Sequence, residues 1–490
     1  MSQQSLKNKT VAGVGWSAAE SFLSHGVTFI VGLVLARLLT PAEYGLIGIV
    51  TIFTTILSSV VDSGFSSALI RYKESTEDDY NTMFITNMVM SVVLYVILFF
   101  CAPFIASFFD RPELVTLTRV MGFILILQAL SIVQNTILTK RIDFKTKAKA
   151  SVIAAILSGI IGIGSAFMGL GVWALVAQQL SNKFCFTVCL WFFNRWWPKF
   201  RFSGSSFRYM WGFGWKLMTS GLLENIWSQL YHVVVGKFYS PATLGQYTRS
   251  KEYAHFFSSN FTTIIQRVSY PVLSEVQDNK VRMVAGYRKI IKLTMFVTAI
   301  CMISLGAVAE PFIYCLIGPQ WHQAATFLPL ICVSLSLYPL HAINLNMLKV
   351  QGRSDIFLVL EIIKKIIAIG PICLGIFIDI YWMLIGSICT GFISFFLNSY
   401  YTGKGLGYTS WMQLKDVAPS YGVACILAVS VFPIKFIPLS YWLILPIQVV
   451  VGISVFFLIC EITKLSEYVE VKGIAMDLLG RFRNKGKNND

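Results

Sequence analysis

The sequence predicts an all-helical integral membrane protein with two similar halves, and three observations support this prediction. The first is composition: of 490 residues, 56% are hydrophobic and only 13% are charged, and the mean hydropathy is +0.67. The second is that apolar runs of roughly 18–25 residues recur along the whole chain, each long enough to cross a ~30 Å hydrocarbon core as a helix. A helix satisfies its own backbone hydrogen bonds, as the membrane interior requires.

The third observation is a near-repeat between the two halves of the chain. The letters G-V-G-W at residues 13–16 open an apolar segment that ends in T-P-A-E-Y-G at residues 40–45. The letters G-F-G-W at residues 212–215 open another, which ends in S-P-A-T-L-G at residues 240–245; the two segments differ in length by one residue. The match indicates a duplicated helical half, as in transporters that bind substrate between their repeats. The alternative is a chance likeness between two apolar segments.

We expect about 14 transmembrane helices in total. In order they lie at residues 11–35, 46–65, 83–108, 114–139, 151–170, 172–193, 215–239, 246–266, 291–317, 322–350, 356–378, 381–401, 417–436 and 441–462. The predicted organisation is an N-terminal six-helix lobe (1–193), an amphipathic cytoplasmic linker (194–214), a C-terminal six-helix lobe (215–401), two additional helices (402–462) and a cytoplasmic tail (463–490). Six is an even number, so the two pseudo-symmetric lobes would run parallel and enclose a central cavity.

The charge distribution predicts the orientation. The net charge is +16, and most of the 40 lysines and arginines fall in the two tails and in alternate loops. Under the positive-inside rule these segments are cytoplasmic, so both termini are expected in the cytoplasm. This topology explains the excess of basic over acidic residues, so we expect no nucleic-acid partner. Lys7 and Lys9 precede an apolar stretch that is too long for a signal peptide.

The linker between the lobes interleaves aromatic and basic residues, reading N-R-W-W-P-K-F-R-F from residue 194. Such a segment is expected at the headgroup level, with its rings toward the hydrocarbon and its cations toward phosphates. The two helices after the second lobe could line a lipid-filled groove or brace that lobe, and bracing is the simpler interpretation.

Polar residues share one face on four of the predicted helices, which are those related by the repeat. These faces are Ser17, Glu20, Ser21, Ser24 and Thr28; Thr51, Thr55, Ser58, Asp62 and Ser66; Glu224, Asn225, Ser228, Gln229 and His232; and Arg249, Glu252, His255, Ser259, Thr262 and Gln266. A charge in the membrane costs about 2.5–3.5 kcal/mol, so we expect these faces to line the cavity. For serine and threonine, ordinary interhelical hydrogen bonding is the stronger alternative.

The ionisable residues within spans are the predicted site. We assign substrate binding to Arg249, Lys251 and Lys183, with Arg37 and Arg119 as further candidates, because arginine forks and lysines suit phosphate. We assign ion coupling to Glu20, Glu224, Asp62 and Glu252, whose carboxylates could titrate. Arg37 and Arg119 lie near span ends, where the alternative is that they snorkel to headgroups.

Several classes of function are disfavoured. The ten cysteines are scattered without ligand spacing, so we expect no metal, disulfide or cofactor. The chain has no P-loop, and its loops are too short to present the catalytic groups of a membrane glycosyltransferase or polymerase. We therefore expect a transporter rather than an enzyme.

Four motifs give the sequence a more specific resemblance. They are L-L-T-P-A-E-Y-G at residues 38–45, G-Q-Y-T-R-S-K-E at 245–252, Y-P-V-L-S-E-V-Q-D-N at 270–279 and Y-R-K at 287–289. With them, the chain resembles the polysaccharide exporters of the colanic-acid type. These belong to the superfamily of multidrug antiporters, oligosaccharide-lipid flippases and lipid II flippases. The resemblance covers essentially the whole chain.

The resemblance implies a flippase that moves an undecaprenyl-pyrophosphate-linked oligosaccharide from the inner to the outer leaflet of a bacterial plasma membrane. It implies alternating access, with lipid-linked oligosaccharide and membrane lipids as partners and with polysaccharide polymerase and glycosyltransferases as possible ones. The first helix offers Glu20 and His25 rather than the arginine cluster of lipid II flippases. The alternatives are a cation-coupled multidrug antiporter, a membrane enzyme acting on polyprenyl-linked glycans, and a scaffold for glycan assembly.

Overall fold

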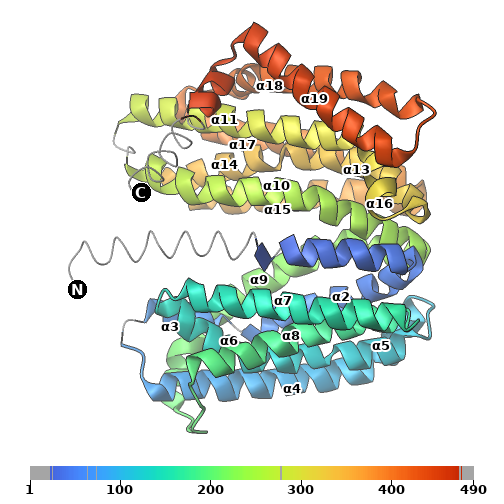
Figure 1. The fold of residues 1–490 in the computed structure, drawn as a ribbon. Coiled ribbons are helices and arrows are strands. Elements are labelled where there is room, and N and C mark those ends of the chain that lie inside the picture. Colours follow the sequence, from blue (N-terminus) through green and yellow to red (C-terminus); the bar gives the residue numbers. More distant parts are fainter. Residues whose placement is uncertain are drawn as a thin grey trace, which may run out of the picture. The chain divides into compact units, whose positions relative to one another are not determined.

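The computed structural model describes residues 23–24, 26–62, 64–72, 74–275, 279–473 and 476, and every regular element in these ranges is a helix. The chain divides into two compact units, with the boundary between Gly245 and Gln246. Figure 1 traces the helices of each unit along the chain. The prediction of an all-helical protein is confirmed.

The first unit begins, within the described residues, with the apolar helix Gly26–Leu38. It continues with α2 (Pro41–Asp62), α3 (Phe65–Arg71), α4 (Glu77–Phe108), α5 (Leu114–Met121), α6 (Phe123–Lys140), α7 (Phe144–Phe167), α8 (Val172–Asn194), α9 (Gly204–Phe238) and the first turn of α10 (Pro241–Glu275). The helices α7 and α8 pack side by side along their length (Figure 1).

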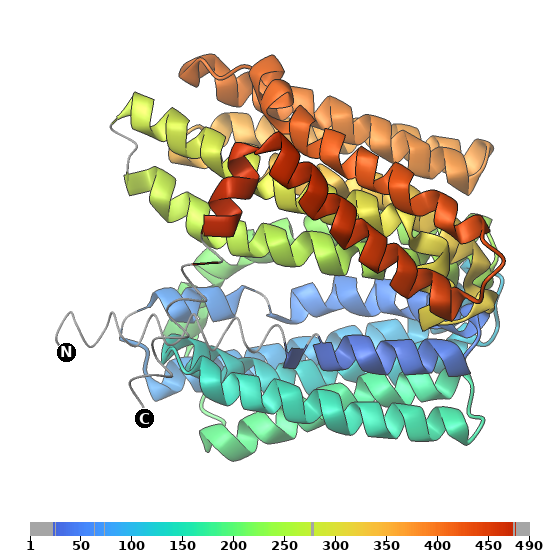
Figure 2. The same cartoon turned by 45° about the horizontal axis from the view of Figure 1, so that its top comes forward.

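The second unit contains the rest of α10 and the helices that follow it. These are α11 (Lys280–Ala307), α12 (Ala309–Leu316), η1 (Pro319–Trp321), α13 (His322–Ser336), α14 (Tyr338–Val350), α15 (Ser354–Ile367), α16 (Ile369–Phe377), α17 (Ile380–Leu406), α18 (Ser410–Val431), η2 (Phe432–Phe436) and α19 (Tyr441–Thr463). The helices α18 and α19 form a hairpin (Figure 2), and α18 packs along α11. This contact agrees with the bracing interpretation of the last two helices.

Local sequence explains where several helices begin and end. Thr76 and Asp79 form a capping box at the start of α4, in which each side chain accepts a hydrogen bond from the backbone N–H of the other residue. Asn279 caps α11 and Thr409 caps α18 by accepting from backbone N–H groups. Gly407, at φ 76°, ends α17 in the left-handed conformation that glycine adopts without strain.

Nine described helical segments are long and apolar enough to cross a membrane. They are Pro41–Arg71, Glu77–Phe108, Leu114–Lys140, Phe144–Phe167, Lys280–Ala307, Pro319–Val350, Ile380–Leu406, Ser410–Phe436 and Tyr441–Thr463. A multi-pass membrane protein is therefore confirmed, while the count of 14 spans stays a prediction. The long helices α8, α9 and α10 are absent from this set of described segments because they carry too many polar residues.

The predicted lobe boundaries also stay a prediction. In the structure, α9 packs against α2, α3 and α4 and so falls within the first unit, although the sequence assigns residues from 215 onward to the second lobe. One reason is visible at Gly64, which separates α2 from α3 at φ 68°. A methyl group built on Gly64 would lie 2.5 Å from the carbonyl oxygen of Gly214 in α9. Two glycines thus permit a close backbone contact.

Candidate functional site

The predicted substrate-binding residues of the first unit occupy three different settings. Lys183 is half-buried on α8, and within the described residues no carboxylate oxygen lies within 4 Å of its ammonium nitrogen. Arg119, on α5, donates from Nε to the carbonyl oxygen of Phe99 at 3.3 Å, and its guanidinium lies 4.3 Å from the centre of the Phe99 ring. Arg37 is exposed near the end of the helix Gly26–Leu38. Arg119 is thus held by a carbonyl oxygen and a ring, whereas Lys183 lies in the middle of α8 with no acid paired to it among the described residues.

The predicted coupling residues of the first unit are also separate. Asp62 ends α2 and accepts a 2.5 Å hydrogen bond from the hydroxyl of Ser66, which in turn accepts from Thr136 at 3.1 Å. This chain of hydroxyls joins α2, α3 and α6. Glu224 is exposed on α9. Glu20 and His25 lie outside the described residues, so the structure gives no setting for them.

In the second unit, α10 has one face that packs and one that does not. Gln246, Ser250 and Ser258 are buried and hydrogen-bond to the backbone of η1 and α13 at 2.8–3.0 Å. The opposite face carries Glu252 and His255, both exposed, with Lys251 half-buried beside them. The buried side of α10 therefore holds uncharged polar residues paired with backbone groups, whereas Glu252 and His255 lie on a side that their own unit leaves uncovered.

Arg249 and Glu252 are brought together directly. A guanidinium nitrogen of Arg249 lies 2.6 Å from a carboxylate oxygen of Glu252, and the arginine side chain is 13% exposed against 54% for the glutamate. Lys251 Nζ lies 5.8 Å from the centre of the Tyr247 ring. A predicted binding residue, Arg249, and a predicted coupling residue, Glu252, therefore form one ion pair across a single helical turn.

The predicted site residues are divided between the two units. Arg37, Asp62, Arg119, Lys183 and Glu224 belong to the first unit. Arg249, Lys251 and Glu252 belong to the second. Their convergence on one central cavity stays a prediction.

The repeated motifs meet in a way that the sequence did not predict. We call residues 41–45 the first Pro-Ala turn and residues 241–245 the second. A methyl group built on Gly45 would lie 1.7 Å from the carbonyl oxygen of Pro241, and one built on Gly245 would lie 1.9 Å from the carbonyl oxygen of Pro41. Each glycine therefore admits the proline carbonyl of the other copy. Only the absence of a side chain allows this reciprocal contact.

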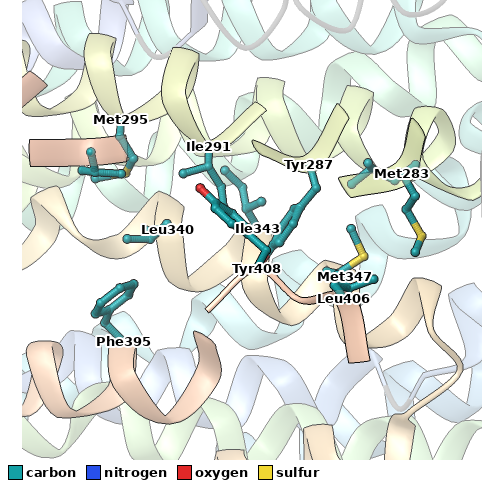
Figure 3. Packing of buried hydrophobic residues seen from close by; sticks show 12 residues of the cluster. Met283, Tyr287, Ile291, Met295, Leu340, Ile343, Met347, Phe395, Leu406 and Tyr408 are labelled. Atoms are coloured by element: carbon teal, nitrogen blue, oxygen red, sulfur yellow. The ribbon is translucent and has the colours of Figure 1, made fainter. Parts of the chain in front are cut away.

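The sequence also did not predict a polar network in the second unit, although one of its residues, Tyr287, belongs to the Y-R-K motif. Tyr287 is fully buried and donates to Asn344 at 2.7 Å, and Asn344 and Gln413 hydrogen-bond to each other through their amides. The Tyr287 and Tyr408 rings meet edge to face, 5.7 Å apart, within an apolar cluster (Figure 3). Spacing alone could not reveal the network because Tyr287, Asn344 and Gln413 lie on three different helices, α11, α14 and α18.

The network continues into ion pairs at the same end of α11. Arg288 donates to both carboxylate oxygens of Asp416, and Tyr408 donates to one of them at 2.7 Å. Lys292 lies 3.8 Å from Asp416 and 3.2 Å from Glu467, which belongs to the short helix 466–473 after α19. A buried carboxylate with several donors is stabilised in its charged form. The cluster ties the last described helix to α11.

Asp110, which lies outside the membrane-spanning helices, has a lowered carboxyl pKa. Lys237 Nζ lies 2.8 Å from Asp110 Oδ2 and donates to it. This hydrogen bond, with the positive charge of Lys237, lowers the pKa of the Asp110 carboxyl below its usual range. The pair connects the end of α9 to the loop after α4.

Comparisons with known proteins agree with this architecture. The family described as "Polysaccharide biosynthesis protein" matches residues 34–326. The succinoglycan biosynthesis transport protein ExoT of Rhizobium meliloti is 25% identical over 368 residues, covering 75% of this chain and 74% of that protein. The lipopolysaccharide biosynthesis protein WzxC of Escherichia coli is 22% identical over 375 residues, covering 76% of each.

Solved structures give the fold. The inward closed lipid II flippase MurJ superimposes with a TM-score of 0.72 at 14% identity, covering 91% of this chain and 98% of that one. An inward-facing multidrug transporter of the MATE family superimposes with a TM-score of 0.59 at 17% identity, covering 79% and 96%. At such identities the likeness concerns the fold alone. Together with the family match over more than half of the sequence, these findings show that the chain belongs to the polysaccharide biosynthesis protein family, in the flippase group that its motifs resemble.

Proposed function

We propose that this chain is a flippase that carries an undecaprenyl-pyrophosphate-linked oligosaccharide from the inner to the outer leaflet of a bacterial plasma membrane. Alternating access of the two units moves the sugar, while the prenyl chain stays in lipid. The termini are cytoplasmic, and the chain alters no covalent bond of its substrate. Membership of the polysaccharide biosynthesis family and the MurJ-like fold support the general class.

The observation that carries the proposal is the presence, within the described residues, of cations on long helices with no acid beside them. Among these residues neither Lys183 nor Lys251 has a carboxylate oxygen within 4 Å of its ammonium nitrogen, and Lys251 lies beside a tyrosine ring. Keeping such charges in a membrane protein is costly. An anionic passenger such as a pyrophosphate offsets that cost when it binds.

The Arg249–Glu252 pair suggests how binding and coupling are linked. An arginine whose guanidinium is paired with a carboxylate must break that ion pair before it can bind a phosphate through both of its donor nitrogens. Glu252 is that competitor, and a proton or another cation on Glu252 would release Arg249 for the substrate. Asp62, Glu224 and Glu20 remain further proposed coupling residues.

A reconstituted leaflet-exchange assay with an undecaprenyl-pyrophosphate-linked oligosaccharide tests the proposal. Because a charge-assisted hydrogen bond contributes about 1.5–3 kcal/mol, Arg249→Ala and Lys183→Ala should each lower the exchange rate about tenfold to a hundredfold. Arg111→Ala is the matched control, since Arg111 is an exposed loop cation. Rates for Arg249→Ala and Lys183→Ala that equal the rate of Arg111→Ala would remove these cations from the site.

Coupling needs its own measurement. Glu252→Gln and Glu224→Gln should flatten the dependence of exchange on a proton or sodium gradient, because an amide cannot titrate. An unchanged gradient dependence in both variants would exclude these two acids. The same vesicles show whether the labelled lipid-linked sugar is recovered with its covalent structure intact, as a flippase requires and a membrane enzyme does not.

A cation-coupled multidrug antiporter is the second candidate, because a MATE-family transporter shares the fold. Uptake of cationic drugs by such a protein favours an anionic pocket, whereas α10 and α8 contribute cations here. A drug-efflux assay in a strain without its own pumps separates the two functions.

A further inference from the structure

The segment that joins α8 to α9 is fixed to the first unit through its backbone. The sequence predicts a linker over residues 194–214, and from here on the name is kept for residues 195–203, the part that lies between the two helices. The Lys199 amide donates to Asn81 Oδ1 at 2.8 Å, the Ser203 amide donates to Thr82 Oγ1 at 2.9 Å, and Gln134 donates to the Trp196 carbonyl at 2.7 Å. These bonds attach the linker to the first turns of α4 and to the end of α6.

The anchor residues set the depth of the linker in the bilayer. At 1.5 Å per residue, the 32 residues of α4 extend about 48 Å, which exceeds the ~30 Å hydrocarbon core. The excess places roughly the first 9 Å of a centred helix outside the core. Asn81 and Thr82 lie about 6–8 Å from the start of α4, so we expect the linker to lie in the headgroup layer when α4 is centred on the core.

The linker leaves its large rings exposed at this depth. Trp196 packs edge-on against Tyr80 and Phe84 of α4, whereas Trp197, Phe200 and Phe202 are 67%, 77% and 57% exposed. Phe200 adopts φ 52°, a left-handed conformation that is unfavourable for a bulky residue. The hydrogen bonds on either side of Phe200 hold this conformation, in which one edge of the ring contacts Phe84 and most of the side chain stays exposed.

Two of the three cations of the linker have no acid beside them in the part of the chain that the structure describes. Arg195 and Arg201 are exposed, and no carboxylate of the described chain lies within 4 Å of either guanidinium. Lys199 has one distant partner, Glu77, at 4.0 Å. Exposed cations interleaved with exposed rings complement a surface that is anionic outside and apolar beneath.

We propose that the linker is a binding surface for anionic phospholipid headgroups of the surrounding leaflet. Arg195 and Arg201 take the phosphates, and Trp197 and Phe200 insert at the level of the glycerol and upper acyl chains. The lipid thereby holds the α8–α9 connection on the membrane. This role is separate from substrate transport and requires no particular oligosaccharide.

Hydrogen exchange of the full chain in lipid nanodiscs tests the assignment. In phosphatidylcholine bilayers that also contain phosphatidylglycerol, backbone amides of the linker should exchange more slowly than in phosphatidylcholine alone. Since each surface cation contributes about a fivefold preference for anionic lipid, Arg195→Gln/Arg201→Gln should reduce the phosphatidylglycerol effect by more than tenfold. Lys147→Gln/Lys149→Gln removes the same charge from α7 and should keep the effect.

Three results of this experiment would contradict the proposal. Equal exchange in the two bilayers, or equal loss in both double variants, would show that no lipid site exists at the linker. The same protection from inorganic phosphate in pure phosphatidylcholine would show a free-anion site instead. Protection that appears only when a cell extract is added would indicate a protein partner. Unchanged exchange in α6 and α7 verifies that the variants are folded.

Discussion

The two Pro-Ala turns start from nearly the same residues but open helices of different character. Each turn places a glycine against the proline carbonyl of the other copy. Four residues after the glycine, α2 has the buried Ile49 and α10 has Arg249. The helix that follows the first turn is apolar enough to be a span, whereas α10 carries ions. The duplication has therefore kept a backbone contact and changed the surface chemistry.

The largest effect is expected from breaking the backbone contact itself. Gly45→Ala or Gly245→Ala would place a methyl group within 2 Å of a carbonyl oxygen. Neither partner is a flexible side chain, so the cost should reach the upper end for overpacking, about 3 kcal/mol. We expect a large loss of thermal stability in detergent and of transport. Gly221→Ala in α9 is the control, because a methyl group there meets nothing within 4 Å; equal melting of all three variants would contradict the role of the contact.

The next effect tests the difference in surface chemistry. Lys251→Thr gives α10 the residue that α2 has at the corresponding position, Thr51. We expect leaflet exchange to fall about tenfold or more while the melting temperature is kept, because a charge-assisted contact to the substrate is lost. Lys251→Arg preserves the charge and should retain most of the activity. A full rate in Lys251→Thr would mean that the polar face of α10 does not contact the substrate.

A smaller effect distinguishes the caps of the two turns. Thr40 and Glu43 form a reciprocal pair, in which Glu43 Oε2 accepts from the Thr40 amide at 2.7 Å and from its hydroxyl at 2.9 Å. In the second turn Ser240 accepts from the Thr243 amide at 3.1 Å without a carboxylate. Thr40→Ala should cost about 1 kcal/mol and Ser240→Ala about half of that. Thermal melts of both variants check the order, and a larger loss for Ser240→Ala would reverse our interpretation.

The smallest effect concerns the residues just before the turns. Lys237, at the end of α9, lowers the pKa of Asp110, and the position corresponding to Lys237 before the first turn is Arg37. A lowered carboxyl pKa stabilises the fold above the unfolded value of about 3.9, and this contribution is lost as pH falls through the folded pKa. Asp110→Asn should therefore flatten the acid limb of the melting-temperature profile slightly. An unchanged limb would show that the pair contributes nothing.

The sequence predicted the helices and their polar faces because these depend on local composition. The stripe on α10 is visible from the three-residue spacing of Arg249, Glu252 and His255, and the structure leaves Glu252 and His255 exposed within their unit. The Arg249–Glu252 ion pair follows from the same spacing. These features require no knowledge of which helices meet.

The contacts between distant helices could not be predicted in the same way. The repeat was recognised, but nothing in the letters P-A-E-Y-G and P-A-T-L-G says that the two glycines face each other's prolines. The Tyr287–Asn344–Gln413 network joins helices that are far apart in the chain, and single polar residues in apolar helices are too common to pair by inspection. The packing of α9 on α2 likewise depends on a close approach of Gly64 to Gly214, which the sequence does not indicate.

The ion cluster at α11 has a consequence for how the protein is made. Lys289 and Lys292 are neutralised in part by Glu470 and Glu467 of the helix 466–473. During biosynthesis these lysines emerge long before the acids that pair with them, because all the helices from α12 to α19 are translated in between. Until then the nascent second unit carries an unpaired basic patch, and contacts of such high sequence separation form late in folding. Deleting residues 466–473 should therefore delay or prevent maturation of a unit whose membrane helices are otherwise intact.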